Sequence, residues 1–182
     1  MRIVQVSSEA VPFAKTGGLA DVAGALCKAL SDLGHEVTLI LPLYSPFIAK
    51  SAIAVAPIGD TFEIPLGERQ VRIQLQRAQM PGSRVKVVLV DQPELYDRAG
   101  LYQDPITKAD YSDNPERFIA FSRAALEAVA RLRLMPDVIQ AHDWQTALVM
   151  PLLEAQFRQW VPELRRTAAI MTLHNMTFQG SY

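Results

Sequence analysis

The stretch Lys15-Thr16-Gly17-Gly18-Leu19-Ala20-Asp21 lies between a predicted first strand, residues 2–7, and a predicted first helix, residues 19–33. Two adjacent glycines allow a tight turn that exposes backbone N–H groups. The helix that follows adds unpaired N–H groups and the positive end of its dipole, and Lys15 adds a full positive charge. The stretch therefore predicts a site for a phosphate or diphosphate group. It matches neither G-x-G-x-x-G nor G-x-x-x-x-G-K-[ST], so it does not suggest a nicotinamide enzyme or an ordinary nucleotide hydrolase.

The residues around this stretch predict a βαβ unit. Apolar residues recur at helical spacing and predict the buried face of the first helix: Leu19, Val22, Leu26, Leu30 and Leu33. Gly34 is a natural helix stop, and residues 36–41 form the predicted second strand. The crossover should be right-handed and the two strands parallel.

Within residues 53–91 the apolar periodicity changes to two. Apolar and polar residues alternate in two runs separated by the turn-forming pair Pro81-Gly82: Val71, Ile73 and Leu75, then Val85, Val87 and Leu89. This pattern predicts a half-exposed antiparallel extension of the parallel sheet.

The second half of the chain returns to alternating helices and strands. Residues 91–113 are polar and irregular, and so long a loop favours a functional role. Asn114-Pro115 starts a predicted helix, residues 137–141 and 166–173 are predicted strands, and residues 144–160 read as mostly helical with a kink at Pro151. The predicted fold class is α/β, with a parallel sheet flanked by helices.

Composition narrows the class of protein. The 182 residues suffice for one domain, with 49% hydrophobic and 20% charged residues. A net charge of -1 gives no support for a nucleic-acid or membrane-surface partner. No run approaches the roughly 18 apolar residues that span a membrane, and Met1 leads straight into a strand without a signal peptide. A cytoplasmic location is expected, with a plastid as the alternative if a transit peptide was removed. The single cysteine, Cys27, is predicted to be a buried packing residue.

Three polar clusters occupy equivalent places in the predicted fold. They are residues 7–18 after the first strand, His142-Asp143-Trp144 after the strand that ends at Ala141, and His174-Asn175 after the last strand. Ligands of open parallel sheets bind beyond the carboxyl ends of the strands. The three clusters should therefore converge on one site.

Each candidate residue also has a purely structural interpretation. Lys15 and Glu9 fit solvated surface residues, and Asp21 fits a carboxylate that complements the first helical turn. Asp143 and Asn175 fit caps of helices or turns, and His142 and His174 fit hydrogen-bonded structural histidines. Tyr96 and Tyr102 fit either packing aromatics or a platform for a sugar. The histidines and the single cysteine lack the spacing of a metal site.

Several motifs, in order and across nearly the whole chain, resemble glycogen and starch synthases. They are Ser7-Ser8-Glu9, residues 15–22, Leu95-Tyr96-Asp97-Arg98, residues 142–146, Thr172-Leu173-His174-Asn175 and Gln179-Gly180. The resemblance implies a retaining glucosyltransferase of the GT-B fold, in which two Rossmann-like domains face a cleft. Such enzymes transfer glucose from ADP-glucose to an α-1,4-glucan such as glycogen or starch, without a metal or other cofactor.

The resemblance also implies roles for individual residues. Lys15 and the backbone of Gly17 and Gly18 would bind the donor diphosphate, with Asp21 supporting the loop and Glu9 a polar contact. His174 would lie by the transferred glucose, as a catalytic residue together with His142. His142 and Asp143 would line the same cleft, Asn175 would be a substrate-binding residue, and Tyr96 would lie nearer the glucan.

The resemblance assigns residues 1–182 to the N-terminal, acceptor-side domain, which normally packs against a C-terminal nucleotide-sugar domain. Because half a cleft cannot enclose a transition state, we expect this chain alone to be inactive. One alternative is a non-catalytic glucan-binding or regulatory module of the same fold. Another is a related glycosyltransferase with a different donor, such as UDP-glucose.

Overall fold

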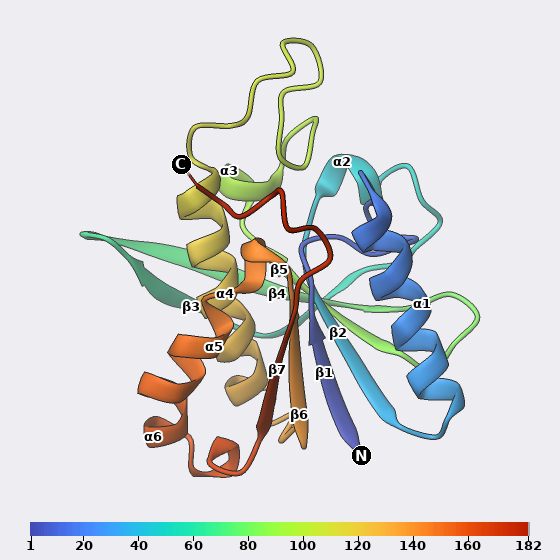
Figure 1. Cartoon of the computed structure of the whole chain (residues 1–182), viewed down its shortest axis with the longest axis vertical. Coiled ribbons are helices and arrows are strands. Elements are labelled where there is room, and N and C mark those ends of the chain that lie inside the picture. Colours follow the sequence, from blue (N-terminus) through green and yellow to red (C-terminus); the bar gives the residue numbers. More distant parts are fainter. Residues whose placement is uncertain (182) are drawn as a thin grey trace.

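The computed structural model describes residues 1–181, which form one mixed sheet covered by helices on both faces (Figure 1). Within these residues the sheet has seven strands in the order β3-β4-β5-β2-β1-β6-β7. The strands are β1 (Arg2–Val6), β2 (Glu36–Pro42), β3 (Ala56–Leu66), β4 (Arg69–Gln79), β5 (Lys86–Asp91), β6 (Val138–His142) and β7 (Ala168–Thr172). The helices are α1 (Gly18–Asp32), α2 (Ser45–Ile48), α3 (Pro93–Tyr96), α4 (Asn114–Arg131), α5 (Val149–Leu152) and α6 (Arg158–Trp160).

The predicted α/β fold is confirmed. Strands β5, β2, β1, β6 and β7 are parallel, whereas β3, β4 and β5 pair antiparallel. The assignment of β5 to a half-exposed extension is wrong in part, because β5 pairs parallel with β2 on its other edge. Val88 and Val90 are as buried as Val87 and Leu89, so β5 is covered on both faces, as parallel strands usually are.

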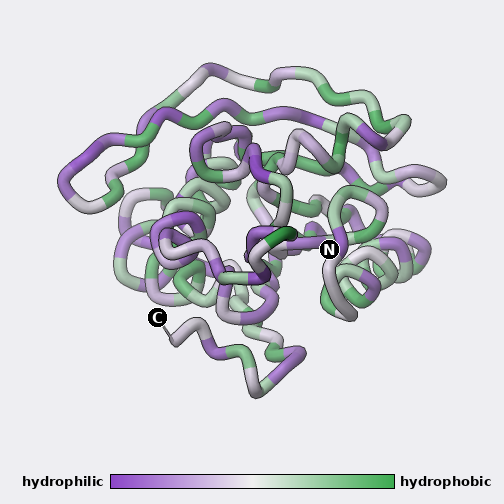
Figure 2. Tube along the Cα trace, turned by 90° about the horizontal axis from the view of Figure 1, so that it is seen from above, coloured by the Kyte–Doolittle hydropathy of each residue, from purple (hydrophilic) through white to green (hydrophobic). Residues whose placement is uncertain are grey.

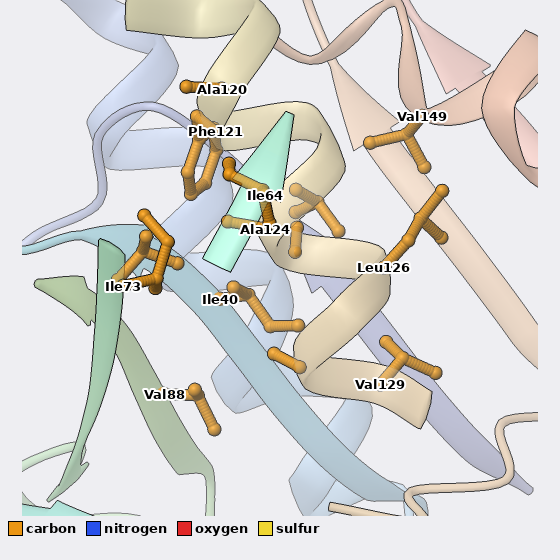
Figure 3. Close-up of a cluster of buried hydrophobic side chains, with 14 of the residues drawn as sticks. Ile40, Ile64, Ile73, Val88, Ala120, Phe121, Ala124, Leu126, Val129 and Val149 are labelled. Carbon is orange, nitrogen blue, oxygen red and sulfur yellow. The ribbon is translucent and has the colours of Figure 1, made fainter. Parts of the chain in front are cut away.

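Two hydrophobic cores lie on opposite faces of the sheet. On one face α4 packs Phe121, Ala124 and Val129 against Ile40 and Val88 (Figure 3). On the other face α1 packs against alternate residues of β2 and β5. Because side chains of a strand alternate between faces, the central strands fill both cores.

The predicted buried face of α1 is wrong in part, since Leu19 is buried and Leu30 packs against the core as predicted. Val22 and Leu33 are 47% and 74% exposed, and the buried residues are mostly small: Leu19, Ala20, Ala23, Gly24, Cys27 and Ser31. The reason is a close approach at Gly24, where an added Cβ would lie 2.5 Å from the backbone oxygen of Val11. Cys27 is buried as predicted, and burial raises the pKa of its thiol to about 12.

The predicted helical segment after β6 is a series of short turns. A 3-10 turn (Trp144–Thr146) precedes α5, and a π-helical turn (Leu153–Phe157) separates α5 from α6. The break follows Pro151, as expected of a residue without a backbone N–H. Beyond β7 the chain continues along the outside of the molecule. There Leu173, Met176 and Phe178 are exposed, and Figure 2 shows apolar stretches in the segment leading to the C-terminal label.

Candidate functional site

A cleft of about 780 Å³ lies at the carboxyl edge of the parallel strands. All three polar clusters contribute to its lining: Glu9, Lys15, Gly17 and Gly18 after β1, Asp143 and Trp144 after β6, and His174 and Asn175 after β7. The loop of residues 97–113 forms another wall, at the upper end of the molecule in Figure 1. The structure thus brings together the clusters that the strand order predicts to meet.

Glu9 holds the glycine stretch in place. Its carboxylate, 3% exposed, accepts hydrogen bonds from the Thr16 hydroxyl at 3.0 and 3.1 Å, from the Gly17 N–H at 3.4 Å and from the Thr16 N–H. The interpretation of Glu9 as a solvated residue is therefore wrong. Because Glu9 occupies these two N–H groups, a ligand meets mainly the first-turn N–H groups of α1, which lack partners within the helix.

Gly17 and Gly18 do not form the predicted tight turn. Gly17 is extended, with φ -146° and ψ -164°, a conformation open to any residue. An added Cβ at Gly17 or Gly18 would meet nothing within 4 Å. The absence of side chains here leaves the backbone open to the cleft, which suits close approach by a ligand.

Lys15 and Asp21 form an ion pair at the mouth of the cleft. The Nζ atom of Lys15 lies 2.7 Å from both carboxylate oxygens of Asp21. Both side chains are about half exposed, at 52% and 55%. Asp21 does not line the cleft itself, but it contacts Lys15, which does.

His142 lies behind His174. The His142 side chain is fully buried, and its Nδ1 atom lies 2.8 Å from Nε2 of His174. Burial, together with the nearby charge of His174 when that ring is protonated, lowers the pKa of His142 from 6.5 to about 4. The expectation that His142 lines the cleft is therefore wrong, since only His174 of this pair does so.

Asp143 joins the ends of β6 and β7. Its Oδ1 accepts the backbone N–H of His174 at 2.6 Å, and its own N–H donates to the backbone oxygen of Thr172 at 2.9 Å. Its side chain caps no helix, so that alternative is wrong, and its φ of 57° is a rare conformation for a non-glycine residue. Asn175 instead accepts the N–H of Thr177 at 2.9 Å, which fits its turn-forming interpretation.

Tyr96 does not reach the cleft, so its predicted place near a glucan is wrong. It is fully buried, and its hydroxyl donates to the backbone oxygen of Arg117 at 2.9 Å. The neighbouring Tyr102 lines the cleft instead, with its hydroxyl 2.7 Å from Oγ of Ser8 and its ring centroid 5.7 Å from that of Phe118.

Two residues were not predicted as site residues. Trp144 lines the cleft and packs edge-on against Phe118, with ring centroids 5.2 Å apart. Its position directly after β6, beside His142 and Asp143, is the sequence feature that could have identified Trp144 as a site residue.

Arg117 is fully buried and donates to the backbone oxygens of Leu95 and Leu101, at 2.6 and 2.8 Å. These bonds anchor the start of the loop of residues 97–113. No local pattern marks a buried arginine.

Residues 1–181 contain neither a metal-binding cluster of side chains nor a membrane-spanning helix. No group of three or more His, Cys, Asp or Glu side chains is arranged to hold a metal ion. None of the described helices has the length and apolar character needed to span a bilayer.

A parallel sheet with a polar cleft beyond its carboxyl edge defines the class of α/β ligand-binding domains. Comparison with known proteins narrows this class. Residues 2–182 match the family model of the starch synthase catalytic domain. The chain therefore belongs to the starch synthase catalytic domain family.

The chain is 39% identical to glycogen synthase 2 of Geobacter metallireducens and 40% identical to the glycogen synthase of Elusimicrobium minutum. Both alignments cover 100% of this chain and 36% of the relative, so the chain spans about a third of these curated relatives. The catalytic domain of starch synthase IV from Arabidopsis thaliana, bound to ADP and acarbose, is 30% identical with a TM-score of 0.84, over 98% of this chain and 34% of that one.

Proposed function

We propose that this chain is the N-terminal, acceptor-side domain of a retaining glucosyltransferase of the GT-B fold. The complete enzyme would extend an α-1,4-glucan, glycogen or starch, from ADP-glucose. The convergence of Lys15, Gly18 and His174 on one cleft, in a member of the starch synthase catalytic domain family, carries this proposal. A cytoplasmic location is part of it, with a plastid as the alternative.

In this proposal the glycine stretch binds the donor diphosphate. Lys15 supplies a charge at the mouth of the cleft, and the open backbone of Gly17 and Gly18 lets phosphate oxygens approach the start of α1. As the glycosidic bond breaks, negative charge grows on the departing diphosphate, and a fixed cation stabilises it. Lys15 must leave Asp21, at least in part, to make this contact.

The opposite wall of the cleft holds the sugars. His174 faces the transferred glucose, with His142 behind it and Asp143 fixing its backbone. Trp144 and Tyr102 offer aromatic surfaces, with polar edges, against which a glucan can pack.

The proposed enzyme also needs a second domain. Because the chain spans only 36% of the length of its relatives, we propose that residues 1–182 normally pack against a C-terminal nucleotide-sugar domain. An open half-cleft does not exclude water, which would hydrolyse the donor. We therefore expect the 182-residue chain alone to transfer no glucose.

A chimaera tests the proposal. Residues 1–182 are joined to the segment of Geobacter metallireducens glycogen synthase 2 that follows its matched region, and transfer to glycogen is measured from ADP-glucose and from UDP-glucose. Variants Lys15→Met and His174→Ala are compared with Lys28→Met, which removes an exposed lysine of α1 outside the cleft.

The expected result is transfer from ADP-glucose that falls at least tenfold in the Lys15 and His174 variants and is unchanged in Lys28→Met. Unchanged transfer in both the Lys15 and the His174 variants would overturn the roles assigned to these residues, whereas a preference between ADP-glucose and UDP-glucose reports the joined nucleotide-sugar domain. An inactive chimaera that still binds glycogen would favour the binding module. Activity of the 182-residue chain alone would contradict its proposed dependence on a second domain.

A further inference from the structure

A row of hydrogen-bonded side chains runs beneath His174 across three neighbouring strands. Nε2 of Gln140 donates to Oγ1 of Thr172 at 2.7 Å, and Nε2 of Gln5 donates to Oε1 of Gln140 at 3.0 Å. Oε1 of Gln5 then lies 2.6 Å from Nε2 of His142, whose Nδ1 lies 2.8 Å from Nε2 of His174. Gln5 and His142 are both fully buried.

The strand register explains this row. Gln5 of β1 pairs with Gln140 of β6, and His142 of β6 pairs with Thr172 of β7. Gln140 and His142 are two residues apart, so their side chains leave the same face of β6. The row is therefore built into the sheet and ends at the cleft.

The row has a direction, because an amide oxygen only accepts hydrogen bonds and an amide nitrogen only donates them. The oxygen of Gln5 faces His142, so His142 carries its proton on Nε2 and leaves Nδ1 unprotonated. That Nδ1 accepts the Nε2–H of His174. The ring planes are 23° apart, and a centroid separation of 5.1 Å with a nitrogen–nitrogen distance of 2.8 Å fits two rings that meet edge to edge at these nitrogens.

We propose that Gln5, Gln140 and Thr172 are positioning residues that act through His142 to fix the tautomer of His174. In this tautomer the proton of neutral His174 is on Nε2, and Nδ1 offers a lone pair to the cleft. An unprotonated nitrogen accepts a hydrogen bond from a ligand hydroxyl but has none to give to a carboxylate or carbonyl oxygen. His174 thus selects a hydroxyl donor, which is the chemistry of a sugar.

The choice of a sugar hydroxyl rests on the proposed function, whereas the tautomer itself does not. The low pKa of His142, about 4, supports the arrangement, since His142 stays neutral at neutral pH and keeps the lone pair that accepts from His174. The tautomer can be measured without any substrate, so failure of the glucosyl-transfer assay would leave this proposal standing.

The test is the protonation of each imidazole nitrogen in the ¹⁵N-labelled 182-residue chain at neutral pH, read from two-bond proton–nitrogen correlation spectra. The chain has three histidines, and His35→Gln removes the signals of the third. We expect both His142 and His174 to carry the proton on Nε2. The opposite tautomer, with Nδ1 protonated in both rings, would overturn the proposed direction of the row.

Variants separate positioning from a merely structural role. Gln5→Leu removes the acceptor for His142, so the proton should move to Nδ1 in both histidines. Gln5→Glu restores an acceptor and should keep the wild-type tautomer while raising the pKa of His142. Thr172→Val removes the far end of the row and should give a detectable mixture of tautomers.

The matched control is Gln76→Leu. Gln76 is a half-buried strand glutamine whose Nε2 donates to Asp91 at 2.9 Å, outside the cleft. This variant should leave the histidine spectra unchanged. If Gln5→Leu does not fold, Thr172→Val decides. Wild-type tautomers in every variant that folds would overturn the proposal.

Discussion

The ammonium group of Lys15 lies 2.7 Å from both carboxylate oxygens of Asp21, which stands in the first turn of α1. Both side chains are about half exposed, so water competes with the pair. Exposed ion pairs stabilise proteins by about 0–1 kcal/mol. The pair therefore positions the lysine at the mouth of the cleft and leaves it free to exchange Asp21 for another anion.

Lys15→Met should separate stability from ligand binding. We expect the free energy of unfolding in urea to change by less than about 1 kcal/mol. Under the proposed function, activity of the chimaera should fall by roughly 10- to 100-fold, the equivalent of about 1.5–3 kcal/mol for a hydrogen bond to a charged group. A loss of stability as large as the loss of activity would show that Lys15 is mainly structural.

Glu9→Gln should loosen the glycine stretch without disturbing the sheet. The buried carboxylate accepts from the backbone of Thr16 and Gly17, and a neutral amide makes weaker bonds there. We expect the free energy of unfolding to fall by about 1–3 kcal/mol. Amide hydrogen exchange should accelerate at Thr16 and Gly17 and stay constant in β2. Unchanged exchange at these two amides would contradict the role assigned to Glu9.

Two glycines of the same helix should respond differently to substitution by alanine. Gly24→Ala places a Cβ 2.5 Å from the backbone oxygen of Val11, and we expect it to lower stability by about 1–3 kcal/mol despite the better helix propensity of alanine. Gly18→Ala meets nothing within 4 Å and should leave stability nearly unchanged. Thermal unfolding of the two variants is the direct comparison, and equal losses in both would contradict the close approach at Gly24.

The free energy of unfolding should depend on pH through His142. Its pKa falls from 6.5 to about 4 on folding, so between these values the unfolded chain binds more protons than the folded one. The contribution of neutral His142 to the free energy of unfolding is therefore fully present above about pH 6.5. It is lost as the pH falls towards 4, by about 3 kcal/mol in total. The free energy of unfolding, measured with urea at each pH in this range, should change less steeply with pH in His142→Gln than in the wild type. The same pH dependence in both proteins would contradict a contribution from His142 and assign it to other titratable groups.

Arg117→Met should destabilise the loop of residues 97–113. The variant keeps the apolar stem but leaves the backbone oxygens of Leu95 and Leu101 without their donor. We expect a loss of at least about 2 kcal/mol in the free energy of unfolding, together with faster exchange in the loop.

The matched control for Arg117 is Arg69→Met, which removes an exposed arginine 2.8 Å from Glu116. This variant should lose less than about 1 kcal/mol. Similar losses of unfolding free energy in the two variants would show that the buried hydrogen bonds of Arg117 stabilise the protein no more than an exposed ion pair does.

Local sequence patterns predicted the elements better than the faces they bury. Asn114-Pro115 correctly predicted the start of α4, because a proline at that position suits a first helical turn. The apolar periodicity of α1 predicted its buried face only in part: Leu19 is buried, whereas Val22 is exposed, because burial there also follows the close approach of Gly24 to Val11. Ala23 and Gly24 are buried but small, so a pattern of large apolar residues does not reveal the face on which they lie.

The site likewise has features that the sequence predicts and features that only the tertiary structure decides. The order of strands and helices determined that the clusters containing Lys15, His142 and His174 would meet, because parallel strands place their carboxyl ends at one edge of the sheet. Only the tertiary structure decided that His174 faces the cleft, that His142 lies behind it, and that Tyr96 belongs to the core. These outcomes depend on neighbours far away in the chain. Gln5 and His142 are 137 residues apart, and strand register, which no local pattern encodes, brings them together.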